Sequence, residues 1–439
     1  MHSSNNRIVF DMTHLINWKG NLTGIPRTTD EIARRLREMD NTIFVTWDES
    51  RADFVEIDGE YYYKEIEKHN RDYYKNSPSH KRGTEPTHSA LKAKIRGHFP
   101  TLVHYAIRLR NKLRRTLNRA VTTVENPELY GSVYSVRQND IFFIPCGTWD
   151  NEAYINKTLS YKTKGAKLVF VSYDLLPIVV PQFSGQWGGP MKDFTKKVTA
   201  SCDLVFSISQ FTKQDLTQWL KKQKLAIPNI AVIHLGDTFA EATPVRPSHQ
   251  EFKRSGLKAN GEVFILCTGT VEARKNHTLL YYVYKLAKSK GIALPKLIIA
   301  GRPGHRTENI ISIIQDDPEV NEDMFILDDV NDGELAWLYK HCAFTVYPSF
   351  YEGWGLPIAE SIVQGVPCIC SQTSSMPEVA PGIPDYFNPC SPEECVNLIA
   401  SYATNEDNCY TKAKKRTATY TPTSWDFTFD QIIEEINAL

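Results

Sequence analysis

Residues 343–365 read AFTVYPSFYEGWGLPIAESIVQG, and their pattern predicts the fold of the second half of the chain. Its apolar start, residues 343–347, predicts a buried strand. Pro357 suits the first turn of a helix, and Gly365 suits the end of that helix. The predicted order is strand, loop and helix, and ligands of open α/β sheets bind at this carboxyl end of the strands.

The same rhythm of an apolar run followed by a helical segment repeats along the chain. Continuous apolar runs of this length are typical of parallel strands that are buried on both faces. Outward from 343–347, the predicted strands are 7–12, 42–47, 141–145, 167–173, 204–208 and 230–234, then 263–268, 296–300, 324–327 and 366–370. The fold class is therefore predicted to be α/β, with two Rossmann-like domains.

Breaks in this rhythm give the domain boundaries. Residues 236–261 contain prolines and polar residues without periodicity, which predicts a linker between domains. Residues from about 48 to 139 interrupt the first series and are too long for an ordinary connection, so they are predicted to be an insertion. The predicted segments are an N-terminal domain at 1–240, a C-terminal domain at 256–424 and a C-terminal helix at 425–439.

Charge and cysteine content narrow the possible partners and compartments. Fifty-one basic residues balance 51 acidic ones, so no net field attracts nucleic acid. Nine scattered cysteines without a CxxC pair predict free thiols in a reducing compartment. The start of the chain has no signal-peptide pattern, and no apolar run approaches 18 residues. These features predict a cytoplasmic protein, and a peripheral position at the inner face of the cell membrane is left open.

The loop and helix start at 349–360 carry the predicted chemistry. Free backbone amides of Gly355 and Leu356 would face an anion, and glycine lets a diphosphate approach the backbone closely. Glu352 and Glu360 flank that position, so they could address a sugar at one end of a ligand and a ribose at the other. The alternative is that both glutamates are solvated charges that favour a helix N-terminus by about 0.3 to 1 kcal/mol.

Glu352 and Glu360, eight positions apart in EGWGLPIAE, resemble the two-glutamate signature of glycosyltransferase family 4. That family contains retaining enzymes of GT-B architecture, in which two Rossmann-like domains face each other across a cleft. The resemblance covers most of 7–47 and 140–388 and leaves out the insertion. It continues in GTVEARKNH (269–277), SISQFT (207–212), VNDGEL (330–335) and TSSMPEV (373–379).

The resemblance implies a role for each of several residues. Lys275 and Arg274 would neutralise the donor diphosphate, and Glu360 would bind the ribose hydroxyls while Glu352 meets hydroxyls of the transferred sugar. Fixed cations can stabilise a leaving nucleoside diphosphate, so neither a metal nor a cofactor is expected. Thr270 stands where many relatives have arginine, and Arg274 could supply that cation instead. The remaining donor-side residues are Gly353, Gly355, Leu356, Thr270 and Val330.

Three residues of the N-terminal domain are predicted to face the acceptor or the sugar. Gly24 follows the first strand, where a plain strand-to-helix turn is the alternative. Tyr173 and Asp174 stand where many relatives carry His-Asp. The tyrosine phenol can hydrogen-bond a sugar but cannot act as a base at neutral pH. Asp174 either orients the acceptor or caps its loop. The family also implies that helix 425–439 crosses back to the N-terminal domain.

Residues 81–120 of the insertion are strongly basic, and leucines after Pro100 recur at steps of three or four. This pattern predicts a basic amphipathic helix, which could bind an anionic membrane surface and bring the site to a lipid-linked glycan acceptor. The alternative is that its apolar stripe packs on the N-terminal domain.

The predicted function is therefore retaining transfer of a hexose from a nucleotide-diphosphate sugar to a glycan acceptor. The strings GIPR and RKNH resemble those of bacterial surface-polysaccharide mannosyltransferases, so GDP-mannose is the favoured donor. Such enzymes make O-antigen, capsule or exopolysaccharide. The alternatives are a UDP-sugar-dependent transferase, a nucleotide-sugar epimerase of the same architecture and a non-catalytic sugar-binding scaffold.

Overall fold

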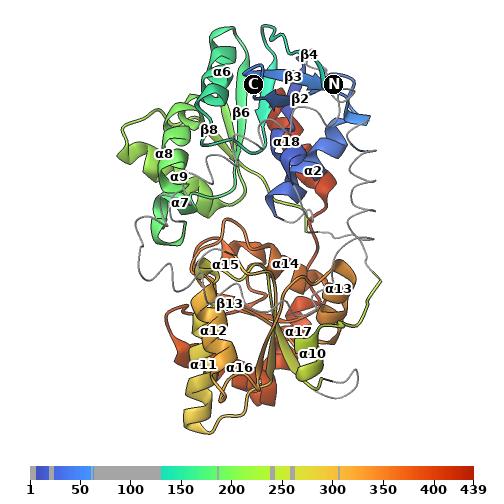
Figure 1. The fold of residues 1–439 in the computed structure, drawn as a ribbon, viewed down its shortest axis with the longest axis vertical. Helices are drawn as coiled ribbons and strands as arrows, with labels where there is room; N and C mark the ends of the chain where they lie inside the picture. The colour runs from blue at the N-terminus through green and yellow to red at the C-terminus, as the bar shows by residue number, and fades with distance from the viewer. Residues whose placement is uncertain are drawn as a thin grey trace, which may run out of the picture. The chain divides into compact units, whose positions relative to one another are not determined.

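The structure is a computed structural model that describes residues 6–18, 24–60, 63, 130–184, 187–237, 243–257, 263–304 and 307–439. The predicted basic helix within 81–120 lies outside these residues. The strands form two sheets, and the predicted α/β class with two Rossmann-like domains is confirmed (Figure 1). By its internal contacts the chain divides into one unit of Met1–Lys19, Leu36–Phe143 and Asn151–Ala166, and a second of Gly20–Arg35, Ile144–Asp150 and Lys167–Leu439.

The first sheet has the strand order β4-β3-β2-β1-β5-β6-β7-β8. Its strands are β1 (Ile8–Asp11), β2 (Thr42–Asp48), β3 (Asp53–Ile57), β4 (Tyr130–Val133), β5 (Ile141–Ile144), β6 (Lys167–Ser172), β7 (Leu204–Ser207) and β8 (Asn229–Val232). Strand β1 pairs in parallel with β2 and β5, and β7 pairs in parallel with β6 and β8. The six strands that the sequence predicts in this half are all present.

Both ends of the predicted insertion at 48–139 belong to this first sheet. Strand β3 runs antiparallel to β2, and β4 runs antiparallel to β3. The sequence did not predict them, because β3 mixes partly exposed and buried residues instead of forming a continuous apolar run.

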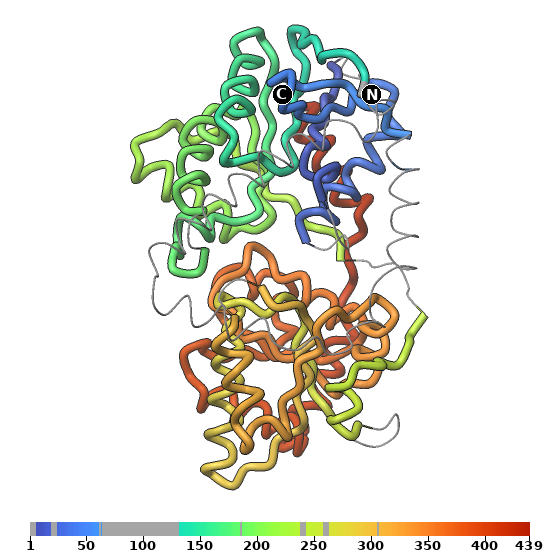
Figure 2. Tube along the Cα trace, in the orientation of Figure 1, coloured from blue at the N-terminus to red at the C-terminus, as the bar shows by residue number. Residues whose placement is uncertain are grey.

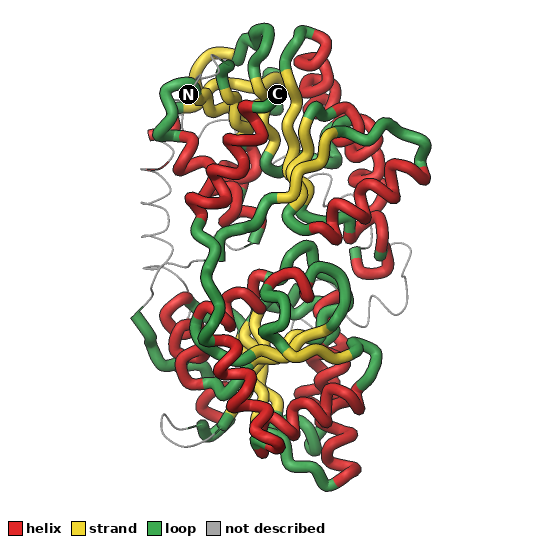
Figure 3. The backbone as a smooth tube through the Cα atoms, turned by 180° about the vertical axis from the view of Figure 1, so that it is seen from behind, coloured by secondary structure: helices red, strands yellow, loops and turns green. Residues whose placement is uncertain are grey.

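The second sheet has the order β11-β10-β9-β12-β13-β14, and its paired strands are parallel. They are β9 (Phe264–Thr268), β10 (Lys296–Ala300), β11 (Met324–Leu327), β12 (Thr345–Tyr347), β13 (Cys368–Ser371) and β14 (Asp385–Phe387). Figure 3 shows the strands of this sheet with helices on both sides. The five predicted strands of this half are confirmed, and three-residue β14 is additional.

Within the described residues, α-helices follow most of the strands, and the course of the chain can be traced in Figure 2. They are α1 (Thr13–Asn17), α2 (Ile25–Leu36), α6 (Glu152–Thr163), α7 (Leu176–Val179), α8 (Gly188–Lys197), α9 (Gln210–Lys222), α10 (Gln250–Arg254), α11 (His277–Lys290), α12 (Glu308–Asp316), α13 (Asp332–His341), α14 (Leu356–Val363), α15 (Met376–Val379), α16 (Pro392–Thr404), α17 (Cys409–Thr417) and α18 (Trp425–Asn437). None of the helices in the described part of the chain could cross a bilayer as an apolar span.

The C-terminal helix α18 contacts residues from early in the chain. The hydroxyl of Thr428 donates to the carbonyl of His234 at 2.6 Å, and Arg35 forms an ion pair with Asp426 at 2.7 Å. The side-chain oxygen of Gln431 accepts a hydrogen bond from the backbone amide of His234 at 3.0 Å. All five residues belong to the second unit.

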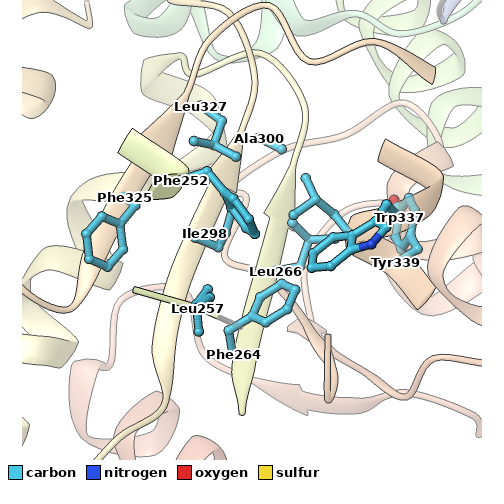
Figure 4. Close-up of a cluster of buried hydrophobic side chains, with 11 residues drawn as sticks. Phe252, Leu257, Phe264, Leu266, Ile298, Ala300, Phe325, Leu327, Trp337 and Tyr339 are labelled. Atoms are coloured by element: carbon cyan, nitrogen blue, oxygen red, sulfur yellow. The ribbon is translucent and has the colours of Figure 1, made fainter. Parts of the chain in front are cut away.

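A buried cluster holds α13 against the second sheet (Figure 4). Trp337 is packed edge-on against Phe252, with ring centroids 5.4 Å apart, and lies parallel to Phe264 at 6.5 Å. Tyr339 belongs to the same cluster and is 3% exposed. Helix α13 begins at a capping box in which Asn331 and Glu334 satisfy each other's backbone amides. Cap and core together fix the position of Tyr339.

Candidate active site

The loop between β12 and α14 has the conformation that the sequence predicts. Helix α14 begins at Leu356 directly after Gly355, whose φ is +129°, a value that residues with side chains rarely adopt. Pro357 lies in the first turn, where its missing N–H leaves no hydrogen bond unmade. Gly365 follows the end of the helix at φ +71°. The predicted strand, loop and helix are therefore confirmed.

Glu352, in this loop, lies between two cations. Its Oε1 accepts from Nζ of Lys275 at 2.9 Å and from Oγ of Ser349 at 2.8 Å, and its Oε2 accepts from Arg274. Burial raises the pKa of this carboxyl, but the charges of Arg274 and Lys275 outweigh that effect and bring the pKa to about 2. Glu352 is therefore ionised at neutral pH although its side chain is only 12% exposed.

The segment that carries the two cations is fastened to the same loop. Asn276 ends the short turn Ala273–Lys275 in a left-handed conformation with φ +58°. Its side-chain amide donates to the carbonyls of Pro348 at 3.0 Å and Pro389 at 2.9 Å. The backbone amide of Phe350 donates to the carbonyl of Arg274 at 2.8 Å. These bonds hold the cations at a fixed distance from Glu352.

The two cations differ in the donors that they can offer to a ligand. The Nη1 of Arg274 donates to Glu352 and to the carbonyl of Tyr351 at 3.1 Å, and its Nη2 pairs with Glu272 at 2.7 Å. Most of the guanidinium is thus engaged within the protein. Lys275 has three ammonium donors and gives one of them to Glu352. Lys275 is accordingly the better placed of the two to receive a phosphate oxygen, and Arg274 chiefly holds Glu352.

Glu360, in α14, has a different environment. Burial raises its pKa, and a hydrogen bond from Tyr339 opposes that shift. The hydroxyl of Tyr339 lies 3.1 Å from Oε2 of Glu360. The two glutamates thus have different surroundings. Glu352 lies between two cations, whereas Glu360 contacts a buried hydroxyl.

Two further residues predicted on the donor side are placed less directly. Thr270 is exposed just beyond β9, and Gly304 in the next loop lies so close that an added Cβ would come 2.6 Å from Cγ2 of Thr270. Val330 packs its side chain against the buried cluster around Trp337. A contact between Val330 and a ligand would therefore have to use its backbone.

Gly353 lies beside two residues predicted on the acceptor side. A Cβ at Gly353 would come 2.1 Å from the carbonyl oxygen of Tyr173 and 3.1 Å from Cβ of Asp174, so only glycine fits. All three residues belong to the second unit. The strand end that carries Tyr173 and the loop that carries Glu352 are thus adjacent.

Tyr173 and Asp174 also line a small pocket at the end of β6, together with Cys146, Trp149 and Met191. The carboxylate of Asp174 accepts from the backbone amide of Leu176 at 2.9 Å, so Asp174 does cap its loop. Burial raises the pKa of Asp174 and also raises that of Tyr173, which keeps the phenol protonated at neutral pH.

Gly24 precedes α2 with φ +59°, and its carbonyl accepts from the amide of Thr28 at 3.0 Å. An added Cβ would meet no atom within 4 Å, so the requirement for glycine here is conformational. Helix α1 separates Gly24 from β1 in the chain, and Gly24 directly precedes α2.

Sequence reasoning missed several hydroxyl groups of the site. Ser374 accepts the backbone amide of Glu352 at 2.9 Å, although its own φ is +52°. In the sequence, the string TSSMPEV was the only feature that pointed to Ser374. Thr268, Tyr339 and Tyr347, described below, look like ordinary core residues in the sequence. No group of three or more His, Cys, Asp or Glu side chains that could hold a metal occurs within the described ranges.

Solved structures of similar fold place the chain in the GT-B class. A glycosyltransferase of Rickettsia africae aligns over 99% of this chain and 99% of its own, with 14% identity and a TM-score of 0.55. Anabaena Alr3699/HepE, solved in complex with UDP and glucose, aligns over 99% of this chain and 100% of its own, with 15% identity and a TM-score of 0.59. At such identities the likeness concerns the fold, and the predicted GT-B architecture is confirmed.

A family match covers most of the C-terminal half of the chain. Residues 248–419 match the family described as "Glycosyl transferases group 1". The relationship to glycosyltransferases that the motifs predict is confirmed.

Two curated relatives come from Escherichia coli. The "Serotype-specific mannosyltransferase WbdA" is 25% identical over 268 residues, which cover 58% of this chain and 32% of the relative. The "O-antigen chain mannosyltransferase B" is 30% identical over 183 residues, 41% of this chain and 46% of the relative. The matches thus span between about a third and a half of these relatives' lengths.

Proposed function

We propose that the protein is a retaining glycosyltransferase that moves mannose from GDP-mannose to a glycan acceptor during the synthesis of a bacterial surface polysaccharide. One observation carries this proposal: ionised Glu352 is held between Lys275 and Arg274 beside the amino end of α14. The domain family and the names of the mannosyltransferase relatives support the reaction class and the sugar.

The donor diphosphate is assigned to the space between Lys275 and the first turn of α14. Backbone amides at a helix N-terminus favour an anion, and Gly355 leaves no side chain in front of them. Lys275 adds a full positive charge at this position. Glu352 would then accept hydroxyls of the transferred sugar, and Glu360 those of the ribose.

The chemistry follows from where charge develops. As the glycosidic bond breaks, the leaving diphosphate gains negative charge, and a fixed cation that stabilises that charge lowers the barrier. Tyr173 stays protonated, so it can orient a sugar hydroxyl but cannot remove its proton. We assign deprotonation of the acceptor to the departing phosphate, on the same face of the sugar, which retains its configuration. The proposal includes neither a metal nor a cofactor.

The acceptor is proposed to be a lipid-linked glycan at the cytoplasmic face of the membrane. This part of the proposal rests on the basic composition of residues 81–120, which lie outside the described residues. A UDP-sugar donor, an epimerase and a sugar-binding scaffold remain as the alternatives.

A donor panel tests the proposal. The purified chain is incubated with GDP-mannose, UDP-glucose or UDP-N-acetylglucosamine, with and without glycan acceptor, and free nucleoside diphosphate is measured. We expect release with GDP-mannose only when acceptor is present. If nucleoside diphosphate were released only from a UDP-sugar, the donor would be a UDP-sugar. Conversion of the sugar without acceptor would indicate an epimerase. Binding without any turnover would indicate a scaffold.

Two lysine variants separate the site from the general charge of the domain. Lys275→Ala should reduce turnover roughly a hundred- to a thousandfold, the scale for removal of a preorganised charge stabiliser. Lys290→Ala is the matched control, because Lys290 pairs with Glu393 on the surface and its side chain is 40% exposed. Equal activity of both variants would remove Lys275 from the donor site.

A further inference from the structure

Three buried hydroxyl groups form a connected chain beneath Glu360. The hydroxyl of Tyr339 lies 3.1 Å from Glu360 Oε2 and 2.9 Å from Oγ1 of Thr268. Oγ1 of Thr268 lies 3.1 Å from the hydroxyl of Tyr347. All three hydroxyl residues are at most 4% exposed. Water therefore has little access to this chain, and its members satisfy one another.

The fold brings these groups together from separate elements. Thr268 and Tyr347 are the last residues of β9 and β12, which are parallel neighbours. The register pairs Leu266 with Thr345, so Thr268 and Tyr347, two residues further on, lie level and on the same face. Tyr339 comes from α13, which the buried cluster of Figure 4 holds against the sheet.

The directions of the hydrogen bonds follow from the number of protons. Tyr339 donates its single proton to Oε2 of Glu360, so its hydroxyl oxygen is left to accept from a neighbour. Tyr339 can then accept from Thr268, and Thr268 from Tyr347; the hydroxyls of Tyr339 and Tyr347 also lie 3.4 Å apart. When Tyr347 donates to Thr268 and Thr268 to Tyr339, all three O–H dipoles point toward Glu360. Hydrogen bonds aligned in this way polarise one another and strengthen the last bond.

We propose that the hydroxyls of Tyr347, Thr268 and Tyr339 form a positioning relay that holds the Glu360 carboxylate in one orientation, as an acceptor for the vicinal diol of a nucleoside diphosphate. The inference rests on the proposed function, because it takes a ribose as the group that meets Glu360. Tyr339 uses one lone-pair direction of Oε2. A carboxylate has about four lone-pair directions in total, so Glu360 can still accept hydrogen bonds from two ligand hydroxyls.

The relay has a consequence that a purely structural role of Tyr339 would not have. Loss of its hydroxyl should weaken the binding of ligands that carry the ribose diol and leave ligands without the diol unaffected. The bond lost is made to a charged group, so the expected weakening is roughly tenfold. Tyr347→Phe removes only the far end of the relay, and its effect should be smaller and in the same direction.

Calorimetric titration of the full chain with GDP and with 2′,3′-dideoxy-GDP tests this inference, with UDP titrated in parallel. We expect Tyr339→Phe to bind GDP about tenfold more weakly than the wild type and to bind the dideoxy analogue equally well. Glu360→Ala should likewise lose the preference for GDP over its analogue. The control is Tyr402→Phe, because Tyr402 is 2% exposed and donates to another carboxylate, that of Asp385. That variant should bind both ligands as the wild type does.

The outcomes distinguish the proposed relay from the assignment of Glu360 to the ribose. Wild-type GDP affinity in folded Tyr339→Phe, with a loss in Glu360→Ala, would overturn the relay and leave the ribose assignment standing. Equal losses for GDP and the dideoxy analogue would make Tyr339 a structural residue. Thr268→Val, which keeps the side-chain shape, repeats the test should Tyr339→Phe fold poorly. A wild-type chain that binds no nucleoside diphosphate would refute the proposed function itself.

Discussion

Replacing Glu352 by glutamine should make the protein less stable at neutral pH and should make the difference from the wild type shrink in acid. In the folded protein the pKa of Glu352 lies at about 2, against an ordinary value of 4.5. A carboxyl group whose pKa is lower in the folded than in the unfolded protein stabilises the fold. This stabilisation is fully present above the pKa of the unfolded state and is lost as the pH falls through the pKa of the folded state. The sensitive range therefore runs from about pH 5 down to about pH 2.

The magnitude follows from the size of this shift. One pKa unit corresponds to about 1.36 kcal/mol, so the difference between 4.5 and about 2 amounts to roughly 3 kcal/mol at pH 7. The side chain is only 12% exposed, so solvent screening reduces this value little. Linkage predicts that about a quarter of it is lost at pH 4 and somewhat less than half at pH 3.5.

Urea denaturation of the full chain at pH 7, 5, 4 and 3.5 measures this dependence, with tryptophan fluorescence as the signal. Wild-type and Glu352→Gln curves should approach each other as pH falls. Glu406→Gln serves as the control, because Glu406 is exposed and lies outside the site. A Glu352→Gln penalty that stayed constant from pH 7 to pH 3.5 would refute the reasoning, because the carboxylate would then not be stabilised by its charge.

Further predictions concern the metal, the loop glycine and the insertion. Transfer should survive excess chelator, and a loss of turnover that a divalent ion restores would contradict metal independence. Gly355→Ala should lower stability by about 1 to 3 kcal/mol in thermal unfolding, because φ is +129°, whereas Gly189→Ala, with no atom within 4 Å of an added Cβ, should not. The chain should float with anionic vesicles at low salt and release at high salt. The variant for this test replaces four arginines of 81–120 by glutamine: Arg108, Arg110, Arg114 and Arg115. If this variant still floated with the vesicles, the membrane contact would lie elsewhere.

The parallel strands could be predicted because strands buried on both faces have continuous apolar sequences, such as FILCT of β9. Strands β3 and β4 could not be predicted in this way. Their residues are partly polar, and they are strands because of their pairing. β3 follows β2 closely in the chain and pairs with its edge, and β4, from much later in the chain, then pairs with β3. The three residues of β14 are too few for any periodicity.

The charged residues of the site could be predicted, because Glu352 and Lys275 lie in strings whose glycines and proline leave few other interpretations. Their pairing could not, since 77 residues separate them and only the folded loop shows that Lys275 donates to Glu352. The hydroxyl relay gave no signal at all. Thr268 and Tyr347 are typical strand residues, and only the packing of α13 on β9 brings Tyr339 to Glu360.

The backbone around Glu352 explains why this site can be ready before a ligand arrives. Asn276 and Ser374 both have left-handed conformations, with φ of +58° and +52°, and Ser374 lacks the tolerance for that region that asparagine has. Each is held by bonds to the loop that carries Glu352: Asn276 donates to the carbonyl of Pro348, and Ser374 accepts the amide of Glu352. Strained residues persist only where their surroundings determine them fully. Because the fold already fixes Lys275 and Glu352 in this way, a diphosphate sugar would meet charges that need not reorganise as the bond breaks, which is the condition under which fixed charges lower a barrier most.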